Sequence, residues 1–571
     1  MDNMSLKRWN LKLQDPIQGN AIDGYVNEAS TSIPGIIQKI LINRGKTKLG
    51  EMEEFFSSSG RAMHDPLSLP GMKAGVDRLS EAINRREPVG IFGDFDVDGI
   101  SGSALLAVAL EEMGATVVTH IPHRVHEGHG LNMDAIRELK RRRVGLVVTV
   151  DCGVTDIEEV DQARDIGVDV IISDHHTPLG QLPPAVAIIN PKLSGSSYPF
   201  SELSGSGLAY KLADGLCSAR GISVGDDVAG LAVLGTIADV VPLVDENRTL
   251  AKLGLSALNN SSNPGLQALY KRANLNQGAI SAEDVSFMIA PRLNAAGRLD
   301  HAYMSYRLLT THSTDEANLL ADKIELLNQE RREVTEKAFD HARNTVTSLT
   351  ELPNILVVGE DWFTPGIAGL VASRLAEEFY RPAIVMCLDG DVVRASARSI
   401  PGFSIVGALD ACGDMFIRYG GHQQAAGFTM DKDNIAGLND QMSEIGAEQL
   451  EGKIVQTVID IDAQVSPTDL MKGNLRWIWD FEPCGYGNPH PTFLAKNLEI
   501  VSMMPVGVHG EHIKFRLKEG NFVWDSIAFR QATNPDINAK MIDVVYNLQV
   551  RDFMGRKTVT LKIIDFKKSG L

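Results

Sequence analysis

Short apolar runs alternate with helical stretches from Pro88 onward, and this alternation is the feature that most constrains the fold. Runs such as PVGIFGD, VGLVVTVD and VDVIISD are rich in Val and Ile, and stretches such as SGSALLAVALEEMG lie between them. Strands that alternate with helices predict a parallel sheet with crossover helices. Strands that are apolar throughout are typical of sheets covered on both faces. We therefore expect an α/β domain built on a parallel sheet.

The predicted strands of this domain end in acidic residues or histidines. In open α/β sheets, ligands bind beyond the carboxyl ends of the strands, so these side chains are expected at one edge. Carboxylates that alternate along an extended segment point the same way and repel one another unless a cation lies between them. An EF-hand loop is excluded for GDFDVDG because no Glu stands at its twelfth position. The residues concerned are Asp94, Asp96 and Asp98 after the first strand, Asp151 after VGLVVTV, and Asp174, His175 and His176 after VDVIIS.

A further acid, Asp239, lies within the apolar run LAVLGTIADVVPL. An unpaired buried aspartate would be costly there, and a shared metal centre would satisfy it. Carboxylates with imidazole suit Mn²⁺ or Mg²⁺. The set is large enough for two ions about 3.5–4 Å apart, as in two-metal phosphoesterases, with Asp151 expected to bridge them. Asp94, Asp151 or Asp174 taken alone is better explained as a helix N-cap, but the whole set favours a metal centre.

The rest of the chain predicts three further parts. A helix over residues 314–346 begins with a capping box of Ser313 and Glu316, and its length favours a bridge between domains. A second α/β segment follows, and from about Gly452 the chain is rich in strands. In HIKFRLK, apolar and basic residues alternate, which fits either a small β-barrel with a basic face or an ordinary solvated strand. We expect boundaries at 1–87 (a segment packing on the first domain), 88–312, 313–347, 348–451 and 452–571.

Composition limits the classes of function and location. The net charge of −18 argues against a surface that coats nucleic acid broadly, but it leaves room for a local basic groove. The first residues contain no apolar signal-like region, and no apolar run is long enough to span a bilayer, so no membrane partner is expected. Five cysteines stand without any C-x-x-C spacing, which indicates reduced cytoplasmic thiols rather than disulfides or a zinc site.

Several motifs occur in an order that resembles one family. GDFDVDG, DHH and GTIADVVPL are similar to the DHH phosphoesterase superfamily. IPHRVHEGHGLN, APRLNAAGR, WFTPGIAGLVASR, SARSIPGF and GGHQQAAG extend the resemblance to the RecJ family of single-strand-specific 5′→3′ DNA exonucleases, over roughly residues 50 to 570. The resemblance implies a DHH domain, a connecting helix, a second α/β domain of the DHHA1 type and a C-terminal OB-fold-like β-barrel. It also implies degradation of single-stranded DNA to 5′-mononucleotides in recombination and repair.

The same resemblance implies roles for individual residues, with two Mn²⁺ or Mg²⁺ ions as cofactors. Single-stranded DNA would be the substrate, with a helicase and a single-strand-binding protein as partners of a cytoplasmic monomer. Without the context of the motifs, each arginine of the substrate-binding set below would be interpreted as part of a surface salt bridge, and His422 as part of a plain turn. The implied metal ligands are Asp94, Asp96, Asp98, Asp151, His175 and Asp239; the implied catalytic residues are His176, Asp151 and Asp174; the implied substrate-binding residues are Arg124, Arg292, Arg298, Ser396, Arg398, Gly421 and His422.

The chain departs from the family pattern at three positions. Phe95 replaces Tyr in GDYD and is benign. His129 in EGHGL and Thr364 in WFTPG replace groups that could contact the DNA strand, so the sequence does not decide the affinity for substrate at these positions. Two other functions compete with the exonuclease: a DHH phosphodiesterase or pyrophosphatase acting on short oligonucleotides or small phosphate esters, and a non-enzymatic replication scaffold. The basic, strand-rich C-terminus favours a polymer substrate. Retention of every presumed ligand argues against the scaffold.

Overall fold

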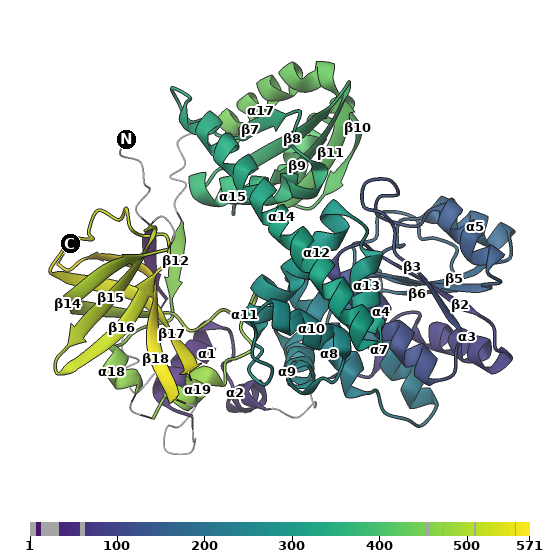
Figure 1. Cartoon of the computed structure of the whole chain (residues 1–571), viewed down its shortest axis with the longest axis horizontal. Helices are drawn as coiled ribbons and strands as arrows, with labels where there is room; N and C mark the ends of the chain where they lie inside the picture. The colour runs from purple at the N-terminus through teal and green to yellow at the C-terminus, as the bar shows by residue number, and fades with distance from the viewer. Residues whose placement is uncertain are drawn as a thin grey trace. The chain divides into compact units, whose positions relative to one another are not determined.

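The computed structural model describes residues 7–12, 33–57, 63–450, 457–471, 473–507, 510–553 and 556–570 (Figure 1). The chain divides into two compact units, which we call the central unit (residues 60–455) and the terminal unit (residues 1–59 together with 456–571). Within the described residues, no helix combines the length and the hydropathy needed to cross a bilayer.

The first domain of the central unit is built on the predicted parallel sheet. Its five strands lie in the order β3-β2-β4-β5-β6, and every neighbouring pair is parallel. All residues of β2 and β4 are buried, as expected for strands without a polar face. The strands are β2 (Val89–Gly93), β3 (Val117–His120), β4 (Leu146–Val150), β5 (Asp169–Ser173) and β6 (Ala187–Ile189).

Helices cover both faces of this sheet. One core joins α3, α4 and α7 to the strands and continues into a helical layer, while a smaller core joins α5 and α6 to the other face (Figure 1). The alternating α/β pattern was therefore a correct guide to the fold. The helices are α3 (Met72–Arg85), α4 (Val97–Glu112), α5 (Met133–Arg141), α6 (Ile157–Asp165), α7 (Gly205–Ala219), α8 (Asp226–Ala238), α9 (Asp245–Asn260), α10 (Pro264–Arg272), α11 (Ala282–Asp284), α12 (Ala290–Leu299) and α13 (Tyr303–Thr310), with the short turns Pro66–Ser68 and Val285–Ile289.

The long helix α14 (Thr314–Thr347) joins two domains of the central unit. Its first half contributes Ile324 to the core of the first domain, and its second half contributes Phe339 to the core of the second. Ser313 caps the helix as predicted by accepting a hydrogen bond from the backbone of Glu316 at 3.3 Å. The carboxylate of Glu316 instead accepts from Arg307, so only half of the predicted capping box forms.

The second domain is a mixed five-stranded sheet in the order β10-β11-β9-β8-β7. Only β7 and β8 are parallel, and the other three neighbouring pairs are antiparallel. Helix α15 packs against β8, β9 and the second half of α14. The elements are β7 (Leu356–Glu360), α15 (Pro365–Phe379), β8 (Ala383–Asp389), β9 (Val392–Arg398), α16 (Ile405–Asp410), β10 (Phe416–Gly421), β11 (Ala425–Asp431) and α17 (Ile435–Leu450), with short turns at Gly413–Met415 and Lys432–Asn434.

The terminal unit contains the predicted barrel. Strands β14-β15-β16-β18-β17 follow one another, and pairing of β14 with β17 closes the sheet. In β15, Ile513, Phe515 and Leu517 are buried while the basic residues between them are exposed, which confirms the predicted alternation. The elements are β1 (Arg8–Leu11), α1 (Gly35–Asn43), α2 (Leu49–Phe56), β12 (Val458–Ile461), β13 (Ala463–Gln464), α18 (Pro467–Leu470), α19 (Leu475–Trp479), β14 (Phe493–Val506), β15 (His512–Glu519), β16 (Phe522–Ala528), β17 (Met541–Phe553) and β18 (Arg556–Lys568).

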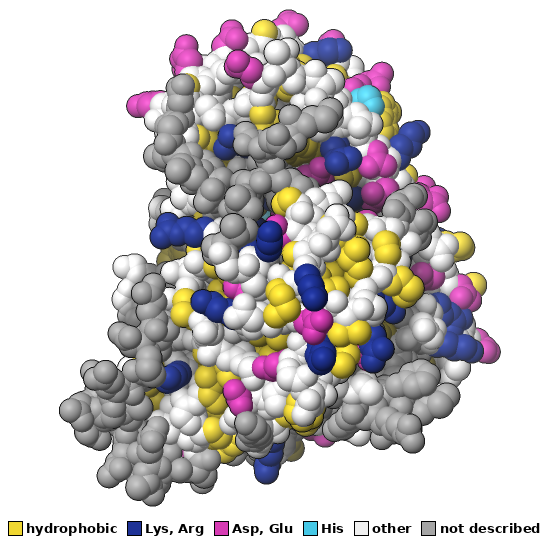
Figure 2. All heavy atoms as spheres, turned by 90° about the vertical axis from the view of Figure 1, so that its left-hand side faces the viewer, with side chains coloured by type: hydrophobic (Ala, Val, Ile, Leu, Met, Phe, Trp, Pro, Cys, Tyr) yellow, Lys and Arg dark blue, Asp and Glu magenta, His cyan; other side chains and the backbone are white. Residues whose placement is uncertain are grey.

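The outer face of the barrel mixes charge with exposed apolar groups. Arg516 faces Asp525 at 3.7 Å, and Lys518 faces Glu499 at 3.9 Å. Large apolar side chains such as Met504 and Phe522 are more than half exposed on the neighbouring strands. Figure 2 shows hydrophobic side chains and those of Lys and Arg interspersed on one face of the molecule. The predicted basic face therefore exists, but acidic residues partly offset it.

One expectation about the N-terminus was wrong. Residues 1–87 were expected to form one segment that packs on the first domain, but only the part with α3 does so. Helices α1 and α2 belong to the terminal unit, where Ile37, Leu41 and Phe55 join the core of the barrel. A short amphipathic helix has an apolar face, but its sequence does not specify which core that face will join. The other boundaries stay predictions.

Candidate active site

Two acids lie where β2 ends and α4 begins. Asp94 directly follows β2 and is 5% exposed. Asp96 is the N-cap of α4, because one of its oxygens accepts hydrogen bonds from the backbone of Asp98 and Gly99 at 2.9 and 3.3 Å. Asp96 is thus a helix cap, a role expected for Asp94, Asp151 or Asp174 but not for this residue, and the cap uses one oxygen of its carboxylate.

Asp98 sits in the first turn of α4 and is 1% exposed. Its two oxygens accept hydrogen bonds from the backbone N–H groups of Gly205 at 2.6 Å and Ser206 at 2.9 Å. These groups form the N-terminus of α7, whose dipole favours a carboxylate. The sequence offered no sign of this contact, because it joins residues more than 100 positions apart.

Asp151 follows β4 in a backbone conformation that few non-glycine residues adopt, with φ of +66°. Its backbone N–H donates to the carbonyl of Ser173 at 2.9 Å, which fixes the turn to β5. A Cβ on Gly205 would lie 2.5 Å from the Cβ of Asp151, so only glycine leaves room for this side chain. Such strained conformations persist where the surrounding structure holds them, often at functional sites.

The three residues after β5 have three different environments. Asp174 is 1% exposed, and its oxygens accept from the backbone of Val154 at 3.0 Å, from the backbone of His176 at 3.0 Å and from Nδ1 of His176 at 2.7 Å. His175 is 9% exposed and places Nε2 3.2 Å from Oδ1 of Asp151. His176 is more open to solvent. Asp174 therefore orients His176, while His175 faces the acids.

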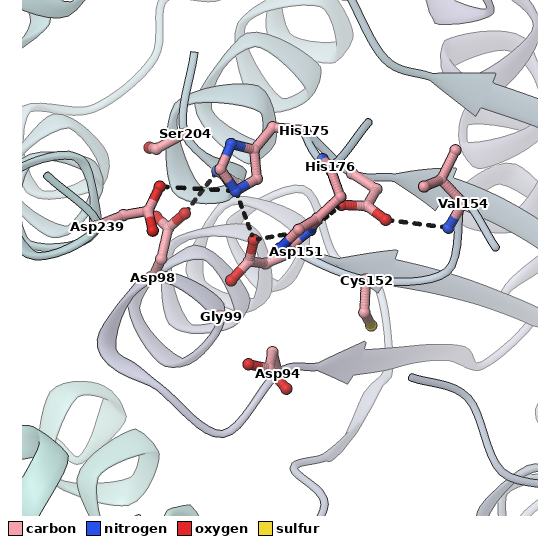
Figure 3. A network of polar contacts seen from close by, with 12 residues as sticks. Asp94, Asp98, Gly99, Asp151, Cys152, Val154, His175, His176, Ser204 and Asp239 are labelled. Atoms are coloured by element: carbon pink, nitrogen blue, oxygen red, sulfur yellow. Dashed lines mark hydrogen bonds and ion pairs between the residues drawn. The ribbon is translucent and has the colours of Figure 1, made fainter. Parts of the chain in front are cut away.

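Asp239 completes the set from a different element. It is the C-cap residue of α8, and its Oδ2 lies 3.6 Å from Nε2 of His175. Figure 3 shows the side chains of Asp98, Asp151, His175 and Asp239 pointing toward one another, with Asp94 beside them. All six predicted metal ligands are thus brought together.

The donors form two adjacent groups. Asp94, Asp96 and Asp151 have ligand atoms within 4.8 Å of one another, and so do Asp98, His175 and Asp239. Asp151 also belongs to a third such group with His175, and therefore lies between the first two. Two adjacent triads of this kind, which meet where Asp151 of the first contacts His175 of the second at 3.2 Å, fit two hard or borderline divalent cations.

The electrostatics show that the donor set suits cations. Burial, followed by the charges of Asp98 and Asp96, raises the pKa of Asp239 to about 9. Burial, followed by the charges of Asp98, Asp96 and Asp94, raises the pKa of Asp151 well above its usual value. Among the described residues, Oδ1 of Asp94 and Oδ1 of Asp151 are buried and accept no hydrogen bond. Mutually repelling carboxylates with unsatisfied oxygens are what divalent cations would relieve.

Three predicted arginines gather in a pocket without carboxylate partners. Burial, followed by the nearby charges of Arg124, Arg331 and Arg398, lowers the pKa of Arg298 to about 9. Arg298 donates to the carbonyl of Gly366 at 2.8 Å, and Arg124 stacks 4.0 Å from the ring centroid of Phe95. Within the part of the chain that the structure describes, Arg124, Arg298 and Arg398 form no ion pair. Unpaired guanidinium groups held together favour binding of a phosphate.

Ser396 and Arg398 lie on the same face of β9, as their spacing requires. A Cβ on Gly369 would lie 2.9 Å from a guanidinium nitrogen of Arg398 and 3.7 Å from the hydroxyl of Ser396. Gly369 is in the second turn of α15, so the small residues of this helix make room for both side chains. The pocket is therefore formed by β9, α12 and the start of α15.

Arg292 does not belong to this pocket, and its predicted role in substrate binding stays a prediction. Its side chain is 9% exposed, its Nε lies 2.6 Å from Glu325 of α14, and it also donates to the carbonyl of Met288 at 2.7 Å. The motif APRLNAAGR holds two arginines that lie on one helix, six positions apart. Helix periodicity points only Arg298 toward the second domain.

The loop between β10 and β11 brings His422 toward the metal centre. The backbone N–H of His422 donates to the carbonyl of Ala425 at 2.8 Å, and Gly421 has φ of +145°, which favours glycine. Burial, followed by the charges of His176 and Lys192, lowers the pKa of His422. Both predicted loop residues therefore lie where the two domains of the central unit face each other.

Lys192 is a site residue that sequence reasoning missed. Its backbone N–H donates to Oδ1 of Asn190 at 2.8 Å, and the buried amide of Asn190 donates to the carbonyl of His176 at 2.9 Å. The charge of Lys192 also opposes the rise in the pKa of Asp239. A signal was present, because the residues NPK follow β6 just as the acids follow the other strands.

The two departures from the family pattern have different surroundings. Nδ1 of His129 lies 3.1 Å from Oδ1 of Asp94. Burial disfavours the charge of His129, but Asp94 outweighs it and raises the pKa to about 9. Thr364 is the N-cap residue of α15, where its side chain makes no capping hydrogen bond. His129 therefore adds a positive charge to the metal centre, whereas Thr364 lies near the arginine pocket.

Comparison with known proteins agrees with this arrangement. Models of the DHH family N-terminal domain, the DHHA1 domain and the RecJ OB domain match residues 88–236, 352–448 and 461–565. The single-stranded-DNA-specific exonuclease RecJ of Bacillus subtilis is 33% identical over 565 residues, covering 98% of this chain and 71% of that protein. The chain belongs to the RecJ family.

Solved RecJ structures extend the likeness to three dimensions. RecJ from Thermus thermophilus in complex with Mn²⁺ matches with a TM-score of 0.84 at 28% identity, covering 99% of this chain and 80% of that one. The Mg²⁺ complex of RecJ from the same organism matches with a TM-score of 0.78 at 27% identity, covering 99% of this chain and 79% of that one. The RecJ fold therefore accounts for the DHH, DHHA1 and OB domains described above.

Proposed function

We propose that this RecJ-family chain is a metal-dependent exonuclease that degrades single-stranded DNA 5′→3′ to 5′-mononucleotides in recombination and repair. The observation that carries the proposal is the pair of adjacent donor triads, in which Asp151 of the first lies 3.2 Å from His175 of the second, beside an arginine pocket that lacks carboxylate partners. The resemblance of the chain to exonucleases named as single-strand-specific supports the substrate. A scaffold that had lost its activity would not need all six ligand side chains.

We assign the metal ligands to the two triads. Asp94, Asp96 and Asp151 would hold one Mn²⁺ or Mg²⁺, and Asp98, His175 and Asp239 the other, with Asp151 between them. The chemistry that two such cations supply in phosphoesterases is acidification of water and neutralisation of charge on phosphate oxygens. The N-terminus of α7 holds Asp98, and Asp174 does not enter either triad.

His176 is the proposed catalytic residue that meets the scissile phosphate. Asp174 occupies Nδ1 of His176, so Nε2 is the nitrogen left to face a substrate. Burial disfavours a charged His176, but its bond to Asp174 outweighs burial and raises the pKa of the ring. A protonated Nε2 would donate to a phosphoryl oxygen or give its proton to the leaving oxygen.

Other side chains of the central unit would hold the strand. We assign the terminal 5′-phosphate to Arg124, Arg298, Ser396 and Arg398, because arginine forks bind phosphate oxygens bidentately. Lys192 and His422, which face the metal centre from two domains, would contact the next phosphate. Backbone groups at Gly421 allow close approach of the strand. The exposed basic residues of β15 would bind the strand farther along.

Product analysis tests the proposal. A single strand labelled at one end is incubated with the full chain in Mn²⁺, in Mg²⁺ and in chelator. Labelled mononucleotide should appear first from the 5′ label, and only with a metal. Early release of the 3′ label, or undiminished cleavage in chelator, would contradict the polarity or the metal requirement. Preference for dinucleotides over long strands would instead favour the small-substrate phosphodiesterase.

The partners and location expected from the resemblance are also proposals. All five cysteines are free and buried, which supports a reducing, cytoplasmic environment. Light scattering of the purified chain tests the monomeric state. Stimulation of digestion by a helicase on duplex DNA, and by a single-strand-binding protein on long strands, tests the two partners.

A further inference from the structure

A second set of metal-binding side chains lies in the terminal unit, outside the nuclease site. The loop between α19 and β14 brings together Glu482, Cys484 and His490, whose ligand atoms all lie within 4.8 Å of one another. Nδ1 of His490 is 3.3 Å from Oε1 of Glu482. Cys484 is 7% exposed. A thiol, an imidazole and a carboxylate thus meet within nine residues of chain.

Other groups build this loop. The amide of Asn488, which is 1% exposed, donates to the carbonyls of Phe481 and Pro483 at 2.9 Å each. Gly485 and Asn488 exchange backbone hydrogen bonds of 2.9 and 3.2 Å, which close a tight turn. Arg44 of α1 donates to Oδ1 of Asn488 at 2.5 Å. The backbone N–H of Cys484 also donates to Oε2 of Glu482 at 2.8 Å. The loop is therefore already ordered by its own hydrogen bonds, which lowers the cost of ordering a metal site.

We propose that Glu482, Cys484 and His490 bind one Zn²⁺, which holds the two ends of this loop together. Sulfur with imidazole and carboxylate is a donor set that selects zinc over Mg²⁺ or Mn²⁺. The absence of C-x-x-C spacing had argued against zinc, but here the ligands follow the spacing E-x-C-x₅-H. The site is independent of the proposed nuclease activity.

The distances suit a tetrahedral ion after a small adjustment. Zinc bonds of 2.0–2.3 Å place donors about 3.3–3.8 Å apart. The three donors must therefore close by up to about 1 Å, by the same geometry. The side chains of Glu482 and His490 are 48% and 39% exposed, whereas Cys484 is buried, so the adjustment falls to the two exposed side chains. Of these two, Glu482 also accepts a hydrogen bond from the backbone N–H of Cys484 to its Oε2 at 2.8 Å. The fourth position is left for water.

The charges around the loop also fit. Binding requires the thiolate, so Cys484 gives up its proton to solvent together with its hydrogen bond to the carbonyl of Phe481. The thiolate and the Glu482 carboxylate then offset the two charges of the ion. Arg44 is paired with Asp462 at 3.7 Å, and its guanidinium lies near Cys484.

Cobalt substitution of the full chain tests the proposal. Chelator-treated protein is titrated with Co²⁺ under reducing conditions and followed by absorption. We expect one equivalent to give a thiolate-to-cobalt charge-transfer band in the near ultraviolet, displaced by an equivalent of Zn²⁺. The nuclease site has no thiolate among its proposed ligands, so Asp239→Asn should keep the band. Cys484→Ser should abolish it, and His490→Ala should weaken or shift it.

Control variants separate this site from other thiols and from misfolding. Cys412→Ser, which removes a buried thiol of the central unit, should leave the band unchanged. Zn²⁺ should raise the unfolding midpoint of the terminal unit in the wild type and in Cys412→Ser but not in Cys484→Ser, with all three showing the same far-ultraviolet circular dichroism. Absence of the band in the wild type, or its persistence in Cys484→Ser, would reduce the cluster to a His–Glu ion pair beside a buried thiol.

Discussion

Replacing Asp239 with Asn should make the metal-free protein more stable while destroying its response to metal. The carboxyl of Asp239 is partly buried beside Asp98 and Asp96, and its pKa rises from 3.8 to about 9. At pH 7 the folded state therefore holds a proton that the unfolded chain has released. This difference spans about 3 pH units between the unfolded pKa and pH 7, at about 1.36 kcal/mol for each unit, so it lowers the unfolding free energy by about 4 kcal/mol. The side chain is 29% exposed, and screening by solvent reduces the expected gain in unfolding free energy to about 1–3 kcal/mol.

The pH dependence has a definite sign. A carboxyl whose pKa is higher in the folded state costs stability above its unfolded pKa, so metal-free wild-type protein should lose stability as pH rises from about 4 toward about 9. Asp239→Asn should flatten this dependence. With excess Mn²⁺ the order reverses, because a ligand at 100 times its Kd stabilises the wild type by about 2.7 kcal/mol and the variant has lost a ligand.

Urea unfolding of both proteins in chelator and in Mn²⁺, across that pH range, measures these effects. Asp440→Asn is the matched control, because this exposed carboxylate of α17 should change neither the stability nor the response to metal. A metal-free Asp239→Asn protein that is no more stable than the wild type would refute the reasoning. The protein itself would then satisfy the buried acids, and no cation would be needed to relieve their repulsion.

Four further substitutions test the nuclease assignment. Asp151→Ala should abolish hydrolysis while unfolding stays cooperative, and near-normal turnover would exclude a bridging role. Arg398→Ala should raise KM about 10–100-fold on 5′-phosphorylated strands through loss of a charged hydrogen bond worth about 1.5–3 kcal/mol, and equal effects on 5′-hydroxyl strands would contradict the pocket. Lys192→Gln should raise KM, and it should reduce the magnitude of the slope of log binding constant against log salt concentration by about 0.7, with rescue by Lys192→Arg. An unchanged slope would show that Lys192 does not contact a phosphate. Exchanging Lys514, Arg516 and Lys518 together for Gln should weaken digestion of long strands but spare dinucleotides, and equal loss on both would point to damage elsewhere.

The sheet and the acids could be predicted because they depend on local patterns. The strands are apolar throughout, and parallel strands must deliver their last residues to one edge, so Asp94, Asp151 and His175 had to meet. The long helix was equally plain from its apolar stripe. These features need only periodicity and one topological rule.

What could not be predicted depends on contacts between distant residues. The backbone of α7 donates hydrogen bonds to Asp98, and Gly205 leaves room for the strained Asp151. A glycine or a serine in the sequence gives no indication that it has such a partner. The motif that contains Arg292 and Arg298 could not say which one faces the second domain. The expectation that α1 and α2 pack on the first domain was wrong for the same reason. An amphipathic helix has an apolar face, but its sequence does not specify which domain will cover that face.

Helix α14 has a mechanical consequence for the proposed reaction. Its 34 residues extend about 51 Å, with one end rooted among the helices of the metal-binding domain and the other among those of the phosphate-binding domain. Bending or unwinding it would pull apolar side chains out of two interiors at once. Because the helix is stiff, the distance between the bound end of the DNA and the cleavage site should stay fixed. We therefore expect each catalytic cycle to remove the same length of DNA.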